Sequence, residues 1–165
     1  YEIPKRDWSS DVCSFRSELP LILQLIKDLA EYEKLAHAVV ADEATLRDSL
    51  FRKRAAEVVI GYVDDEPAGF AVFFQTFSTF LGIPGMYLED LFVIPRFRRY
   101  GLGRRLLSHL ATIAVERGYG RIDWNVLDWN APAIDFYKAV GATPMEDWNL
   151  FRLTGDALRQ LGTSR

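Results

Sequence analysis

An arginine- and glycine-rich turn between a buried strand and a long helix, within residues 88–103, is the sequence feature that most limits what this chain can form. The first turn of a helix has unpaired N–H groups and carries the positive end of the helix dipole. Gly101 and Gly103 have no side chain to keep an anion away from those amides. Guanidinium groups suit phosphate oxygens, and three of them flank the glycines: Arg98, Arg99 and Arg104. We therefore predict an anion-binding turn, with a solvated basic surface as the alternative.

The spacing of this turn differs from two common phosphate-binding motifs. It lacks the Gly-Lys-Ser/Thr sequence of the P-loop, and Leu106 stands where Gly-x-Gly-x-x-Gly needs its third glycine. These differences count against a P-loop or Rossmann-type nucleotide binder.

Hydrophobic periodicity divides the rest of the chain into helices and strands. Apolar residues recur with helical spacing from residue 22, which predicts a helix that begins near residue 18. Two strand-like runs, 57–62 and 68–74, flank turn-forming residues and predict a hairpin. The other expected elements are a short helix capped by Asp42, a loop over 77–85, strands over 86–93, 121–126 and 149–153, and helices over 101–117, 130–140 and 155–161. Helices separate the later strands and the middle is an antiparallel meander, so we expect a mixed sheet.

Length and composition indicate one α/β domain. The 20 Lys and Arg residues against 23 Asp and Glu residues give a net charge of −3, which argues against electrostatically driven nucleic-acid binding. No apolar run reaches the roughly 20 residues that span a bilayer, and no signal segment opens the chain, so we expect a cytoplasmic protein without membrane contact. The lone Cys13 requires no oxidising compartment, and His37 and His109 lack metal-ligand spacing, so no metal is implied.

Residues 1–17 show neither a helical nor a strand period. They could be a poorly formed first strand, an ordered arm, or a remnant unrelated to the domain. We favour the remnant, so that the functional domain would comprise residues 18–165.

Two motifs resemble the cofactor motifs of the GCN5-related N-acetyltransferase (GNAT) superfamily. The first is the Arg-x-x-Gly-x-Gly sequence that begins at Arg98, after a strand end of the form Val-x-Pro. The second is the Asn-x-Pro sequence at Asn130, with Tyr137 downstream. The resemblance implies an α/β fold of the α+β kind, with a mixed, centrally splayed β-sheet flanked by helices.

More narrowly, the chain is similar to the diamine (spermidine/spermine) and thialysine acetyltransferase branch of that superfamily. The similar segments are residues 29–34, 87–90, 128–130 and 135–138. The resemblance covers roughly residues 18–161. It implies an enzyme that transfers an acetyl group from acetyl-CoA to a small cationic amine.

The resemblance also implies how acetyl-CoA would be bound. The backbone of the glycine turn would hold its pyrophosphate, and the end of the strand over 86–93 would pair with its pantetheine arm. The residues implied in cofactor binding are Leu91, Phe92, Val93, Arg98, Arg99, Tyr100, Gly101, Leu102, Gly103, Arg104, Asn130, Ala131, Pro132, Ala133 and Tyr137.

Two residues are implied in catalysis. Tyr137 matches the tyrosine that protonates the departing thiolate, and a phenol of pKa about 10 can donate this proton as the bond breaks. Glu89 matches a carboxylate that relays a proton from the amine through water. An alkyl amine has a pKa near 10 and attacks only after deprotonation. A core aromatic and a solvated carboxylate are the structural alternatives, and direct attack needs no nucleophile on the protein.

Acidic residues suit an ammonium-bearing acceptor. The residues implied in acceptor binding are Tyr32, Glu33, Glu89, Asp90, Asp123, Trp124, Asn125 and Glu146. The loop over 77–85 and the triplet 123–125 differ from the animal diamine enzymes. A thialysine-like amino acid is therefore as plausible an acceptor as spermidine.

The resemblance further implies a homodimer. A non-catalytic acyl-CoA-binding regulatory domain is the alternative to an enzyme, although such a domain would not need Tyr137 and Glu89. Acetylation of a different amine or of a peptide also stays open.

Overall fold

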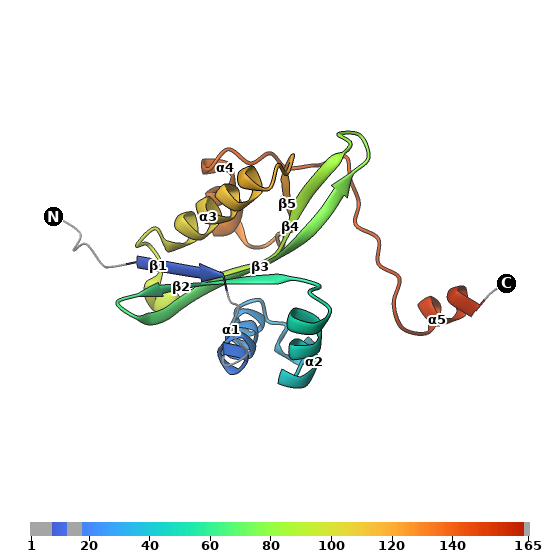
Figure 1. Ribbon diagram of the computed structural model, residues 1–165, viewed down its shortest axis with the longest axis horizontal. Coiled ribbons are helices and arrows are strands. Elements are labelled where there is room, and N and C mark those ends of the chain that lie inside the picture. The colour runs from blue at the N-terminus through green and yellow to red at the C-terminus, as the bar shows by residue number, and fades with distance from the viewer. Residues whose placement is uncertain (1–7, 13–17, 164–165) are drawn as a thin grey trace. The chain divides into compact units, whose positions relative to one another are not determined.

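The computed structural model describes residues 8–12 and 18–163, and the chain divides into two compact units, residues 1–125 and 126–165. The first unit is built on a five-stranded sheet in the order β1-β2-β3-β4-β5 (Figure 1). Strands β1 to β4 are antiparallel neighbours, and β5 lies parallel to β4, which confirms the predicted mixed sheet. The strands are β1 (Trp8–Val12), β2 (Glu57–Val63), β3 (Glu66–Ser78), β4 (Ile83–Val93) and β5 (Ile122–Trp124).

Helices cover both faces of this sheet (Figure 1). Helices α1 (Leu19–Tyr32) and α2 (Glu43–Arg47) lie on one face, and α3 (Leu102–Glu116) lies on the other. A π-helical turn (Asp48–Arg52) continues α2. As predicted, Asp42 caps α2, because its carboxylate accepts a hydrogen bond from the Thr45 N–H at 2.7 Å.

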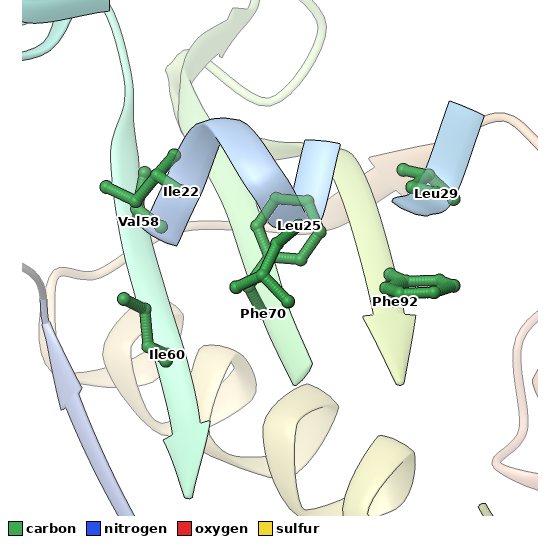
Figure 2. Packing of buried hydrophobic residues seen from close by; sticks show 7 residues of the cluster. All are labelled: Ile22, Leu25, Leu29, Val58, Ile60, Phe70 and Phe92. Atoms are coloured by element: carbon green, nitrogen blue, oxygen red, sulfur yellow. The ribbon is translucent and has the colours of Figure 1, made fainter. Parts of the chain in front are cut away.

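The apolar stripe of α1 forms the core on its side of the sheet. Figure 2 shows the helix crossing the strands, with its first turns against β2 and β3 and its last turn above β4. The buried side chains of this cluster are Ile22, Leu25, Leu29, Val58, Ile60, Phe70 and Phe92. Burying each such side chain contributes about 1.5–3 kcal/mol, so this cluster fixes the end of α1 over β4.

On the other face α3 approaches the sheet closely at Gly61. A Cβ on Gly61 would lie 3.2 Å from Leu102 and 3.3 Å from Leu106, which leaves no room for a larger side chain. The start of α3 is therefore held firmly against the sheet, directly after the end of β4.

Two hairpins connect the antiparallel strands. Asp64 and Asp65 link β2 to β3 with φ values of 51° and 62°, the left-handed pair that suits the twist of a two-residue hairpin. The loop expected over 77–85 shortens to the turn 79–82, because β3 extends to Ser78 and β4 begins at Ile83. Gly85 suggested a loop, but it reflects close packing: a Cβ there would lie 3.0 Å from the Thr76 hydroxyl.

The structure of the N-terminal segment also differs from the favoured interpretation of residues 1–17 as a remnant unrelated to the domain. Its described part is β1, which pairs with β2 from Trp8↔Val63 to Val12↔Val59. Backbone pairing with a distant strand needs no hydrophobic period, so periodicity missed it. The rest of this segment, Cys13 included, lies outside the described residues.

The second unit holds α4 (Ala131–Ala139) and α5 (Gly155–Thr163). Asn130 caps α4 as predicted, by accepting a hydrogen bond from the Ala133 N–H. The strand expected over 149–153 is wrong, since these residues have no regular structure. Leu150 and Phe151 are 72% and 92% exposed. An apolar run gains neither ladder hydrogen bonds nor burial from a strand conformation when no other strand lies beside it. The predicted strand over 121–126 shortens to β5.

Candidate active site

A β-bulge marks the middle of β4. Val72 on β3 pairs with Asp90, but the next residue, Phe73, pairs with Leu88. Glu89 is therefore an extra residue on β4, inserted between two paired positions. Such a bulge re-aims side chains and is frequent beside functional sites. It places two consecutive acidic residues at the point where the strand changes its pattern.

A third carboxylate reaches this point from α1. Glu33 directly follows the last residue of α1 and caps the end of this helix. Its charge acts together with that of Glu89 on Asp90. Burial, followed by repulsion from Glu89 and then Glu33, raises the pKa of Asp90 to about 6. Burial also raises the pKa of Glu33. We name Glu33, Glu89 and Asp90 the carboxylate cluster; Glu89 is its exposed member.

Beyond the bulge, β4 is paired on one side only. Strand β5 pairs with residues 86–88 of β4, whereas β4 continues to Val93. Within the described part of the chain no strand pairs with residues 89–93 on the β5 side of β4. The predicted splay thus lies between β4 and β5, the last two strands of the described sheet. Free N–H and C=O groups at such an edge can pair with an extended ligand, and this edge includes Leu91, Phe92 and Val93.

The turn after β4 ends in an open helix start. Gly101 caps α3 with a φ of 77°, and no side chain caps this helix. A Cβ on Gly103 would meet one described atom within 4 Å, a Val93 methyl at 3.8 Å. Packing therefore does not require glycine at 103. Gly103 instead keeps the space beside the first-turn amides free of a side chain. This free space fits a bound phosphate.

Charge around the turn is unevenly arranged. Arg99 and Arg104 are exposed, and neither forms an ion pair with a carboxylate of the described residues. Tyr100 is 44% exposed, while Leu102 is buried in the core. The guanidinium of Arg98, in contrast, lies over the ring of Tyr32. Two of the three arginines expected at the anion site thus remain available to an anion.

Strand β5 brings a further group of expected residues to the sheet. The Asn125 amide donates a hydrogen bond to the Tyr87 hydroxyl at 2.7 Å. Asp123 forms an ion pair with Arg121 at 2.7 Å, so its charge is already partly balanced. Trp124 pairs with Leu88 and is half-buried. Tyr87 was not among the expected site residues. The pairing of β4 with β5 brings it beside the expected residues of β5.

The remaining expected residues belong to the second unit. Asn130 is buried at the start of α4, and Ala131, Pro132 and Ala133 form the first turn of that helix. The half-buried Tyr137 packs its ring against Phe136, with 5.3 Å between the ring centroids. In addition, Glu146 is exposed.

A mixed sheet splayed beside β4, a bulged acidic strand and an uncapped glycine turn agree with the fold that the resemblance implies. Comparison with known proteins agrees: residues 22–142 match the acetyltransferase (GNAT) family. The chain belongs to this family, and it is an N-acetyltransferase, as the sequence predicts.

The matches to similar proteins cover most of the chain. It is 32% identical over 191 residues to L-ornithine N5-acetyltransferase NATA1 of Arabidopsis thaliana, a match that covers 88% of this chain and 84% of that protein. It is 38% identical over 142 residues to thialysine N-epsilon-acetyltransferase of Caenorhabditis elegans, covering 84% and 88%. Its structure is similar to an integron cassette protein from the mobile metagenome of V. cholerae, with a TM-score of 0.79, 26% identity, and 95% and 98% coverage. No helix in the described residues is long and apolar enough to cross a membrane.

Proposed function

We propose that this protein transfers an acetyl group from acetyl-CoA to a primary amine of a small cationic acceptor, by direct attack of the amine. The carboxylate cluster carries this proposal, because it concentrates negative charge where β4 loses its pairing with β5 on the way to the glycine turn. A cationic acceptor held at the cluster would therefore lie along the same strand edge as the acyl donor.

The residues of the turn and of β4 fit acetyl-CoA. Backbone amides at the start of α3, from Gly101 to Arg104, would bind the pyrophosphate, and the exposed Arg99 and Arg104 would balance its charge. The free edge of β4 would pair with the amides of the pantetheine arm. When bound, the cofactor supplies the thioester that donates the acetyl group.

Glu89 is proposed to accept the proton of the attacking amine through water. The amine, with a pKa near 10, is protonated at neutral pH and must lose this proton before it can attack. Glu89 is exposed and lies in the bulge, so solvent reaches its carboxylate. Asp90, whose pKa of about 6 reflects its burial and its acidic neighbours, supplies negative charge that holds the ammonium group.

Tyr137 is proposed to donate its hydroxyl proton to the departing thiolate. The support for this role is its motif, residues 135–138, together with its position on α4 after the Asn130 cap. Asn130, Ala131, Pro132 and Ala133 are proposed to contact the cofactor.

The proposed acceptor carries two cationic groups, such as a diamine or a diamino acid. A single ammonium group would balance only part of the charge of Glu33, Glu89 and Asp90. The names of the relatives from Arabidopsis thaliana and Caenorhabditis elegans, which specify ornithine and thialysine, agree with this class. Ornithine and thialysine each bear an α-ammonium group and a side-chain amine.

We further propose a homodimer. The resemblance to the diamine branch suggests it, and the second unit exposes an apolar set that a partner would cover: Met145, Trp148, Leu150, Phe151, Leu158 and Leu161. Sedimentation equilibrium tests this proposal, because a monomer at micromolar concentration would contradict it.

Thiol release from acetyl-CoA, measured against a panel of amines, tests the main proposal. The panel contains ornithine, thialysine, lysine, putrescine, spermidine and a short peptide, with a blank that lacks amine. We expect release above the blank with at least one diamine or diamino acid. Acetyl-CoA binding without release for any amine would favour the non-catalytic reading, and release with the peptide alone would overturn the small-acceptor proposal.

A further inference from the structure

The side chain of Arg98 reaches two aromatic rings, one on α1 and one on β4. Its guanidinium carbon is 4.3 Å from the ring centroid of Tyr32 on α1 and 5.6 Å from that of Phe92 on β4. Its Nε–H also donates a hydrogen bond to the Val93 carbonyl at 2.9 Å. One half-buried side chain thus contacts both the last turn of α1 and the end of β4.

The contacted end of α1 leads directly to the carboxylate cluster. Tyr32 is the last residue of α1, and the next residue is Glu33. The rings of Tyr32 and Phe92 are themselves 6.3 Å apart, and Leu29 lies above Phe92 in Figure 2. Arg98 therefore completes a packed junction of Tyr32, Phe92 and Val93, one residue away from Glu33.

We propose that Arg98 is a positioning residue that links the cofactor turn to the acceptor carboxylates by holding Tyr32, and through it Glu33, against the end of β4. This inference rests on the proposed function, since it concerns acceptor binding at that site. Arg98 acts here through its contacts with Tyr32 and Val93, and its guanidinium is not assigned to the phosphate.

The chemistry of the junction favours arginine over lysine. A planar guanidinium can stack on an aromatic ring and donate a directed hydrogen bond at the same time. A lysine ammonium keeps the charge but cannot satisfy both contacts in the same way. Arg98→Lys is therefore expected to rescue only part of the function that Arg98→Gln removes.

The chain offers a matched control at Arg96. Its guanidinium carbon is 4.7 Å from the Phe97 ring centroid, and it pairs with Glu66 at 2.8 Å. Arg96, two residues earlier in the chain, thus also combines an aromatic contact with a hydrogen bond, but its bond is to the Glu66 carboxylate at the β2–β3 hairpin and it does not reach α1. Arg96→Gln should leave the KM for the amine unchanged.

The test is steady-state kinetics with the best amine of the panel, with both substrates varied. Loss of a cation–π contact together with a charged hydrogen bond should raise the amine KM of Arg98→Gln about 5- to 20-fold, with kcat changed less than about 3-fold. In a Tyr32→Leu background the same substitution should add less than about 2-fold, because the contact is already absent. Thermal melts of each variant confirm that it is folded, and Arg98→Lys replaces Arg98→Gln if the latter is not.

Three outcomes would overturn the inference. A rise confined to the KM for acetyl-CoA would mean that Arg98 acts on the cofactor alone. Multiplicative effects of the Arg98 and Tyr32 substitutions would mean that the two side chains act independently, and an equal effect of Arg96→Gln would point to a general loss of charge. If the parent protein acetylates no amine, the proposed function itself fails and the inference fails with it.

Discussion

The carboxylate of Asp90 within β4 has a raised pKa because of burial first, then repulsion from Glu89, and then repulsion from Glu33 at the end of α1. Glu33 and Asp90 are far apart in the chain, and α1, whose crossing of the strands is visible in Figure 2, brings the charge of Glu33 to β4. Burial and mutual repulsion of these carboxylates cost free energy in the protein without a ligand. This cost suggests a site prepared for a cation.

Replacing Asp90 by asparagine should stabilise the protein at neutral pH. The pKa of Asp90 is about 6 in the folded protein, against about 3.9 for an unperturbed aspartate, so the folded state holds the proton more tightly. The contribution of Asp90 to stability is therefore fully present below about pH 4 and is lost as the pH rises through about 6. Allowing for partial exposure, Asp90→Asn should gain roughly 1–2 kcal/mol at pH 7.5, and this gain should shrink toward pH 4.

Urea unfolding of the parent and Asp90→Asn between pH 4 and pH 8 measures this effect. Asp147→Asn, at an exposed aspartate, is the control and should change the free energy of unfolding by less than about 0.5 kcal/mol. A difference between Asp90→Asn and the parent that does not vary with pH would contradict the assigned pKa.

Glu89→Gln should lower the rate most at low pH. The amine is then hardest to deprotonate, so loss of a proton acceptor matters most. The measurement is the profile of kcat/KM against pH from 6 to 9, for the parent and the variant. A uniform loss across this range would instead assign Glu89 to acceptor binding.

Gly103→Val should weaken acetyl-CoA binding by more than about 10-fold, because its side chain would occupy the space above the first-turn amides. The fold should tolerate it, since a Cβ there meets only a Val93 methyl at 3.8 Å. Calorimetry measures the affinity, and a thermal melt measures the stability. Gly101→Ala provides the contrast: its φ of 77° strains any side chain, so this variant should lose stability. Unchanged affinity in Gly103→Val would remove the phosphate from this turn.

Tyr137→Phe should reduce kcat by about 100-fold or more while acetyl-CoA affinity changes little, because the substitution removes one hydroxyl proton and keeps the ring. The ring contact with Phe136 is retained, so the melting temperature should be close to that of the parent. Single-turnover kinetics and calorimetry on the same samples separate the two effects. Equal rates for variant and parent would exclude Tyr137 as the general acid.

Much of the architecture could be predicted because its signals are local. The caps at Asp42 and Asn130 and the glycines at the start of α3 each act within one turn of chain, and the structure has them in those roles. The structure also brings together three of the residues expected at the acceptor site, Glu33, Glu89 and Asp90, while their role in acceptor binding stays a prediction.

What the sequence alone determined was therefore most of the helices and strands and their mixed pairing, while the anion-binding chemistry of the turn stays a prediction. The tertiary structure decided the bulge at Glu89, the pairing of β1, the irregular course of residues 149–153 and the direction of the Arg98 side chain. Capping and turn formation depend on neighbouring residues, so they can be read along the chain. Strand register, burial of a carboxylate and the stacking of an arginine depend on residues that only folding brings into contact.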